Sequence, residues 1–221
     1  MTSTNIRPEK RPMNIFDYIF MSIIALFIGL VISIIIEYSG IFLGYWDIDH
    51  TRQMIVKEVN YLDVGSSNKL PFISTPMESG EAYLKFLNEH GFGFNEVFSY
   101  FVQAGFSDRV STLITIPVGV ISLYGMRLII CFYSLLMFVV LMLIALVEGL
   151  LSRELRILGG GKESAFIYHH LKKRLKPVFG MGWAIYLLSP ISYHPNLILV
   201  PMGVLFALFF RGFVMYWKKV T

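Results

Sequence analysis

Stretches of chain without charged residues constrain this sequence more than any other feature. Between Asp17 and Glu37 lie 19 uncharged residues, and between Arg127 and Glu148 lie 20. Because a helix rises 1.5 Å per residue, each stretch spans about 30 Å, the thickness of the hydrocarbon core of a bilayer. The pattern predicts an all-α integral membrane protein.

Composition agrees with this class. Of the 221 residues, 55% are hydrophobic and 15% are charged, whereas soluble domains have about 45–50% apolar and about 25% charged residues. The single cysteine, Cys131, leaves no partner for an intramolecular disulfide and no thiolate cluster for a metal. No cofactor or metal site is predicted.

A third uncharged stretch covers 177–210, and its 34 residues would make a helix too long for one crossing. Proline breaks helices and asparagine favours turns, so Pro190, Pro195 and Asn196 divide the stretch into two helices. About four transmembrane helices are therefore expected. The uncharged segment 110–126 contains Pro117 and two glycines and precedes the second helix without a loop, which favours an interfacial or re-entrant piece.

The charges between these helices predict the orientation. Loop 38–126 holds five basic and nine acidic residues, whereas loop 149–177 holds seven basic and two acidic residues. Since cytoplasmic flanks are rich in Lys and Arg, both chain ends are expected in the cytoplasm and loop 37–126 on the opposite side, which in a bacterium is the periplasm. The expected units are an N-terminal arm 1–17, helix 18–36, a periplasmic loop domain 37–126, helix 127–148, a basic loop 149–177, helices 178–193 and 197–217, and a tail 218–221.

The external loop, about 70 residues long before segment 110–126, is expected to be partly helical. Residues 81–90 form a short helix ended by Gly91, and 60–76 read as loop. Apolar residues from Phe94 to Val102 recur at helical spacing. That helix packs on its own loop or along the outer leaflet, or it offers a docking face to a partner.

The basic loop contains three glycines followed by Lys162, which invites a nucleotide-binding interpretation. A phosphate-binding P-loop needs glycine at position 156 and Ser or Thr at position 163, but the chain has Arg156 and Glu163 there. We therefore expect the preceding helix to run through Leu158 and to stop at the glycines. A basic surface helix then follows up to Pro177, and its cations are candidates for anionic lipid: Lys172, Lys173, Arg174 and Lys176.

Other polar residues have simpler explanations. His169 and His170 are adjacent, so on a helix they point about 100° apart and do not chelate one metal ion. Glu37 and Glu148 stand at the ends of predicted spans, where solvation at the headgroup level is the ordinary expectation.

The motif Arg153-Glu154-Leu155-Arg156, the run Gly159 to Ser164, and Phe166-Ile167-Tyr168-His169-His170 resemble a bacterial family. It is the integrating conjugative element membrane protein family, a group of unknown function encoded near the type IV coupling protein. The motif covers about 20 residues. The resemblance implies a non-enzymatic inner-membrane component of a conjugative DNA-transfer apparatus of the type IV secretion class. It supplies no catalytic residue.

That resemblance suggests contact with the coupling ATPase or another conjugation subunit through the basic loop. The residues expected to make the contact are Arg153, Arg156, Lys162, Phe166, Tyr168, His169 and His170. Topology explains the basic run better than direct contact with nucleic acid does, and a homo-oligomer is compatible with the sequence. The alternatives are an entry-exclusion or surface-interaction membrane protein and a small transporter or channel; the scarcity of polar side chains within the spans argues against the transporter or channel.

Overall fold

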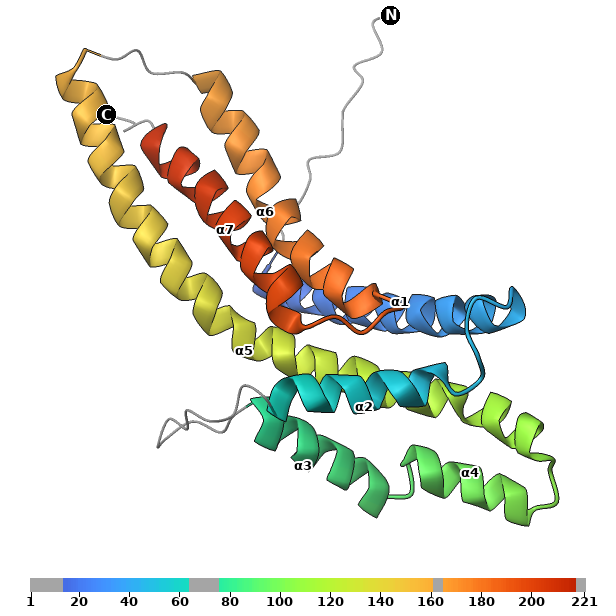
Figure 1. Ribbon diagram of the computed structural model, residues 1–221. Helices are drawn as coiled ribbons and strands as arrows, with labels where there is room; N and C mark the ends of the chain where they lie inside the picture. Colours follow the sequence, from blue (N-terminus) through green and yellow to red (C-terminus); the bar gives the residue numbers. More distant parts are fainter. Residues whose placement is uncertain (1–13, 64–75, 161–164, 218–221) are drawn as a thin grey trace, which may run out of the picture.

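A computed structural model describes residues 14–63, 76–160 and 165–217, and in these ranges all regular secondary structure is α-helical (Figure 1). The helices are α1 (Ile15–Phe42), α2 (His50–Asp63), α3 (Pro76–Glu89), α4 (Phe94–Gln103), α5 (Asp108–Leu158), α6 (Ala165–Leu188) and α7 (Pro195–Met215).

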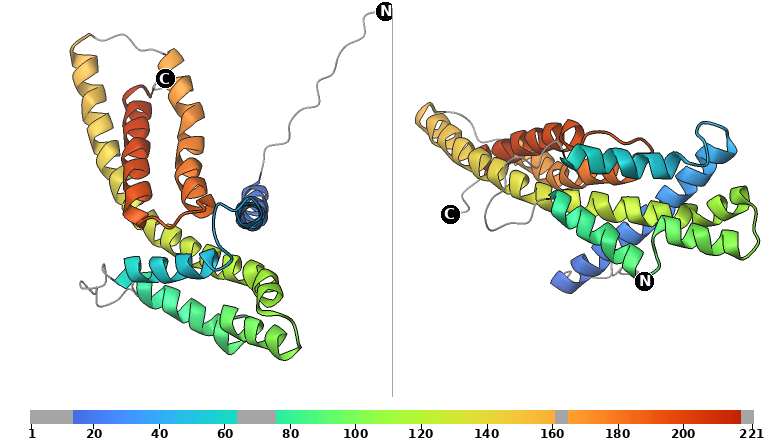
Figure 2. Two further views of the ribbon diagram at one scale, coloured as in Figure 1. Left: turned by 45° about the vertical axis from the view of Figure 1, so that its right-hand side comes forward. Right: turned by 60° about the horizontal axis from the view of Figure 1, so that its bottom comes forward.

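Helix α5 organises the whole molecule. It has 51 residues, which corresponds to about 76 Å. Its first part packs with α2, α3 and α4, and its second part runs beside α6 and α7 (Figure 1). α5 and α7 run in the same direction, and α6 runs in the opposite direction (Figure 2). The C-terminal ends of α5 and α7 therefore lie at the same end of the molecule as the start of α6.

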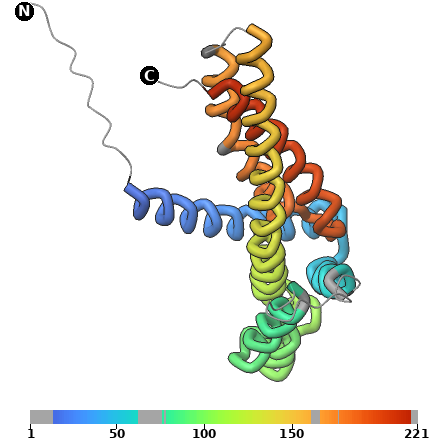
Figure 3. Tube along the Cα trace, turned by 90° about the vertical axis from the view of Figure 1, so that its left-hand side faces the viewer, coloured from blue at the N-terminus to red at the C-terminus, as the bar shows by residue number. Residues whose placement is uncertain are grey.

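Helix α1 crosses this arrangement. It lies across the direction of α6 and α7, and its first half projects away from α5 (Figure 3). Its start is fixed by a capping box in which the Asn14 backbone N–H donates to Asp17 Oδ2 at 2.9 Å. Most of its apolar side chains are exposed, and the buried residues of α1 are Glu37 and Gly40, near its C-terminal end.

Three of the described helices, α1, α5 and α7, are long and apolar enough to cross a membrane. The expectation of four such helices is not confirmed, because α6 carries Lys172, Lys173 and Arg174 in the middle of its 24 residues. Its uncharged part, 177–188, is only about 18 Å long. The helix continues through Pro177, where a boundary between surface helix and span was expected.

Several local expectations are confirmed. α3 and α4 cover the two helices predicted in the external loop, and Gly91 follows α3 with a φ of +75°. α5 ends at Leu158 as predicted, and Gly160 has a φ of +68°, which favours glycine. The helical structure is also interrupted between Leu188 and Pro195, as predicted from the prolines.

Segment 110–126 differs from the expectation of a separate interfacial or re-entrant piece. It forms the first third of α5 and continues into residues 127–148 without interruption, so it is not a separate or re-entrant piece, while an interfacial location stays a prediction. Helix α2 was not expected at all, and most of the stretch 60–76 lies outside the described residues.

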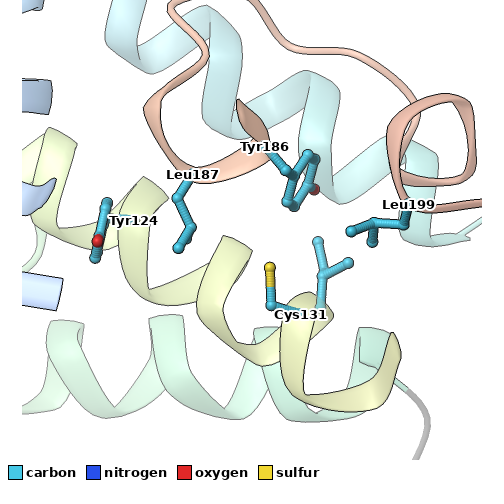
Figure 4. Packing of buried hydrophobic residues seen from close by; sticks show 6 residues of the cluster. Tyr124, Cys131, Tyr186, Leu187 and Leu199 are labelled. Carbon is cyan, nitrogen blue, oxygen red and sulfur yellow. The ribbon is translucent and has the colours of Figure 1, made fainter. Parts of the chain in front are cut away.

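A small apolar core forms where α5, α6 and α7 meet. Tyr124, Cys131, Tyr186, Leu187 and Leu199 converge there (Figure 4). Cys131 is fully buried. α6, α7 and the turn between them (189–194) form the α6–α7 hairpin. The core packs the turn end of this hairpin against α5, directly beside the charged cluster described next.

Candidate functional site

A buried ion pair joins α2 to α5 at the middle of the molecule. Arg127 Nη2 lies 3.0 Å from Glu58 Oε1, and Arg127 Nε donates to the same oxygen at 3.1 Å. The Arg127 side chain is 3% exposed and the Glu58 side chain is not exposed. Charges this deeply buried are costly to desolvate, so the pair is stable only with further hydrogen bonds.

Those further bonds come from the α6–α7 hairpin. Arg127 Nη1 donates to the Ser189 carbonyl at 2.6 Å, and Nη2 donates to the Ile191 carbonyl at 3.4 Å. The Tyr186 hydroxyl donates to Glu58 Oε2 at 3.0 Å. One guanidinium therefore holds α2 and the 189–191 turn together, and it satisfies two carbonyls of that turn, just beyond the end of α6.

A second buried carboxylate, Glu37, ties the end of α1 to the start of α2. Thr51 Oγ1 donates to Glu37 Oε1 at 2.5 Å, and His50 Nδ1 lies 3.0 Å from the same oxygen. Trp46 stacks on the His50 ring with centroids 4.8 Å apart. A Cβ on Gly40 would overlap the Trp46 ring, so this position needs glycine.

This arrangement corrects the expectation that Glu37 is solvated at the headgroup level, since Glu37 is only 2% exposed. It also differs from a hydrolytic triad, in which the histidine stands between hydroxyl and carboxylate. Here the carboxylate stands between Thr51 and His50. The geometry ties the end of α1 to the start of α2.

A cavity of about 20 Å³ lies between the two clusters. Its polar lining includes Glu37, Tyr124, Arg127 and Ser189. A volume of this size has room for about one water molecule. The cavity can hydrate the two charged clusters but is too small for a solute.

A second ion pair stands at the other end of the uncharged part of α5. Arg211 Nε on α7 lies 3.0 Å from Glu148 Oε1 on α5, and both side chains are substantially exposed. From Arg127 to Glu148 the helix rises about 32 Å. The uncharged stretch of α5 is thus bounded by a charged level at each end, separated by about the thickness of a hydrocarbon core.

Tyrosine hydroxyls fasten α1 and α3 to the first part of α5. The Tyr38 hydroxyl donates to the Leu113 carbonyl at 2.9 Å, which lies four residues before Pro117 and so lacks its usual backbone donor. The Tyr83 hydroxyl donates to the Ile121 carbonyl at 3.2 Å. Burial raises the pKa of the Tyr83 phenol above its ordinary value. These contacts hold segment 110–126 against its neighbours.

At the basic end, the residues predicted to contact a partner separate into two groups. Arg153 and Arg156 are half-buried where α5 meets α7, and the Arg156 guanidinium lies 4.6 Å from the Tyr216 ring centroid. Tyr168 is half-buried and stacks on Phe213 of α7 with centroids 5.2 Å apart. Arg156 and Tyr168 therefore fasten α5 and α6 to α7.

The other predicted contact residues are accessible. Phe166 is 73% exposed, and its ring lies 4.7 Å from that of His170. The predicted partner and lipid residues whose side chains are exposed at this end are Phe166, His169, His170, Lys172, Lys173 and Arg174. Lys162 and the side chain of Lys176 lie outside the described residues.

Sequence reasoning missed the central cluster, although one signal was present. Arg127 is the only charged residue between Val110 and Val147. A lone charge in such an apolar run predicts a buried partner. Glu58 and Tyr186 carry no comparable signal, because one lies in a polar segment and the other is one tyrosine among many.

Among residues 14–63, 76–160 and 165–217, no group of three His, Cys, Asp or Glu side chains could hold a metal ion. The fold and these clusters define a helical protein with three helices able to cross a membrane, a buried charge network on one side and a basic end on the other.

Residues 85–212 match the family described as IncC plasmid conjugative DNA transfer protein DtrJ-like. The match covers more than half of the chain, so the protein belongs to the DtrJ-like family and has a role in conjugative DNA transfer. The motif residues 153–170 lie inside the matched region. The resemblance to a conjugation-associated family is confirmed, while the assignment to an integrating element stays a prediction.

Neither the curated proteins nor the solved structures contained a match to this chain.

Proposed function

We propose that this protein is a non-enzymatic inner-membrane component of a conjugative DNA-transfer apparatus of the type IV secretion class. Its basic end faces the cytoplasm and contacts the coupling ATPase or the channel. The observation that carries the proposal is the apolar part of α5, which lies between the Glu58–Arg127 and Glu148–Arg211 ion pairs.

The distribution of charge supports the orientation. Arg153, Arg156, Lys172 and Arg211 all lie at the end where α5 and α7 finish and α6 begins. The α2–α4 layer at the opposite end is rich in acidic residues. Cytoplasmic flanks of membrane helices carry excess Lys and Arg, so the basic end belongs in the cytoplasm.

Helix α1 is compatible with this location. Its 28 residues correspond to about 42 Å, more than a 30 Å core requires, so it fits a strongly tilted crossing. A tilted α1 accommodates the crosswise direction that it takes relative to α6 and α7 (Figure 3).

The polar clusters of the described residues support a role in assembly. The Glu37 and Glu58 carboxylates each bind side chains of neighbouring elements, and the cavity between the clusters holds about one water. This supports neither a catalytic centre nor a path for a solute. The exposed Phe166, His169 and His170 at the basic end supply the surface for a partner.

The test is the frequency of conjugative transfer after deletion of the gene, with the gene restored in either the donor or the recipient. We expect a large loss of transfer that only donors expressing the protein recover. A donor variant with Phe166→Ala, His169→Ala and His170→Ala should fail to restore transfer while the protein still accumulates in the membrane. The matched control is a triple alanine variant at exposed residues of the opposite end, Phe86, Phe92 and Tyr100.

Unchanged transfer from donors lacking the gene would refute the proposal. If recipients lacking the gene then accepted the DNA more readily, the protein would act in exclusion instead. Equal loss with the two triple variants would refute the assignment of the partner contact to the basic end.

A further inference from the structure

The line of contact between the C-terminal ends of α5 and α7, here called the α5–α7 seam, contains three arginines: two on α5 and one on α7. Arg153 and Arg156 are three residues apart on α5, so they lie on one face of the helix. Arg211 and Tyr216 face them from α7: Arg211 Nη2 donates to Ser152 Oγ at 3.5 Å, and Tyr216 lies under the Arg156 guanidinium.

Two of these guanidinium groups have nitrogens without acceptors. Within the described part of the chain, Arg153 Nε and Arg156 Nε and Nη1 are inaccessible to water and have no hydrogen-bond partner. A charged donor that loses its hydration without gaining an acceptor is unfavourable. Both side chains are half-buried overall, so an anion can approach the guanidinium groups from their exposed side and offset this cost.

The charge balance of the seam favours an anion. Glu148 already pairs with Arg211, and Glu154 is exposed. Among the described residues, no carboxylate forms an ion pair with Arg153 or Arg156, so their positive charge is uncompensated within that part of the chain. Arginine presents a planar fork that binds phosphate oxygens in pairs, whereas the exposed Lys172 and Lys173 on α6 act as separate point charges.

The level of the seam indicates where the phosphate comes from. Arg153 follows Glu148, the first charged residue after the apolar stretch, by about 7.5 Å along the helix. The headgroup region of one leaflet is about 5–8 Å thick. Tyr216 and the exposed Trp217 at the end of α7 are side chains typical of the membrane interface.

We propose that the α5–α7 seam binds the phosphate of an anionic phospholipid headgroup of the inner leaflet, through Arg153 and Arg156 with Tyr216 supporting the guanidinium of Arg156. This inference rests on the proposed membrane location. It concerns a specific lipid site and not the general attraction of basic residues to a charged surface.

The experiment is native mass spectrometry of the full-length protein in detergent, with phosphatidylglycerol or phosphatidylcholine added. We expect phosphatidylglycerol to remain bound and phosphatidylcholine to dissociate. The variant Arg153→Gln/Arg156→Gln should lose retention by about tenfold, since it removes charge-assisted bonds. The control Lys172→Gln/Lys173→Gln, which removes the same charge from exposed positions, should retain the lipid.

A conservative variant keeps the test informative if the glutamine variant folds poorly. Arg153→Lys/Arg156→Lys preserves the charge but removes the fork, and we expect intermediate retention. Equal loss in the two glutamine variants, or full retention by Arg153→Gln/Arg156→Gln, would overturn the site.

Two further probes separate the sources of phosphate. Inorganic phosphate that displaces the lipid at modest concentration would assign the site to free anions, and a short DNA duplex that does so would assign it to nucleic acid; either result overturns the lipid assignment. If no lipid binds while donor-dependent transfer is still lost on deletion, the seam proposal fails and the proposed function stands.

Discussion

Removing Arg127 should destabilise this protein far more than removing a surface arginine of the same helix bundle. The Arg127 and Glu58 side chains are 3% and 0% exposed. Arg127→Met leaves the Glu58 carboxylate with Tyr186 as its remaining side-chain donor and removes the donors to the Ser189 and Ile191 carbonyls. Breaking a buried ion pair by removing one partner costs about 3–5 kcal/mol.

The chain supplies its own control in the Glu148–Arg211 pair, whose side chains are 54% and 39% exposed. Exposed pairs contribute about 0–1 kcal/mol. A protein of this size loses about 2–4 °C in Tm per kcal/mol. We therefore expect Arg127→Met to lower the Tm by about 6–20 °C and Arg211→Met by at most about 4 °C.

The assay is thermal unfolding of the purified protein in detergent, followed by intrinsic fluorescence. The double variant Glu58→Met/Arg127→Met should cost less than the sum of its single variants, because it leaves no unpaired charge behind. Two results would contradict this role of the buried pair at the junction of α2, α5 and the α6–α7 turn. One is an equal fall in Tm for Arg127→Met and Arg211→Met. The other is a double variant whose loss of stability equals the sum of the losses of Glu58→Met and Arg127→Met.

Two smaller predictions concern packing. Gly125→Ala should lower the free energy of unfolding by about 1–3 kcal/mol, because the new Cβ would lie 2.2 Å from the Tyr83 hydroxyl oxygen. Gly180→Ala, whose Cβ would have nothing within 4 Å, should leave the stability unchanged or raise it. Equal Tm values for the two variants would contradict this packing. Cys131 should resist maleimide in the native protein and react once denaturant is added, since its side chain is fully buried; rapid labelling of the native protein would show that the core opens readily.

Much of the fold could be predicted from the sequence because the signals are local. Uncharged length identified the long apolar helices, glycines with positive φ marked the ends after Glu89 and Leu158, and prolines marked the break before α7. Each signal depends on a few consecutive residues.

The rest depends on contacts between residues far apart in the chain. The sequence predicts Arg127 only as the boundary of a span, and the position of Glu58, 69 residues earlier, gives no hint that the two side chains meet. Glu37 was expected in solvent because nothing near it in sequence predicts Thr51 as its donor. The continuity of α5 through Pro117 likewise depends on a hydroxyl from Tyr38 on α1.

The candidate contact site was only partly predictable for a similar reason. The motif around residues 153–170 indicated the correct family context, but helical spacing alone does not tell which side chains face α7. The structure turns Arg156 and Tyr168 toward α7 and leaves Phe166, His169 and His170 exposed. Only the exposed residues remain accessible to a partner.

The central claim is that the apolar part of α5 crosses the inner membrane with the basic end in the cytoplasm. The most direct measurement is labelling of single cysteines in intact cells with a maleimide that does not cross the inner membrane. In a Cys131→Ala background, Phe92→Cys lies at the α2–α4 end and Leu158→Cys at the basic end, and both native side chains are exposed.

We expect Phe92→Cys to be labelled in intact cells and Leu158→Cys only after the cells are lysed. Labelling of both positions in intact cells, or of Leu158→Cys alone, would contradict the account.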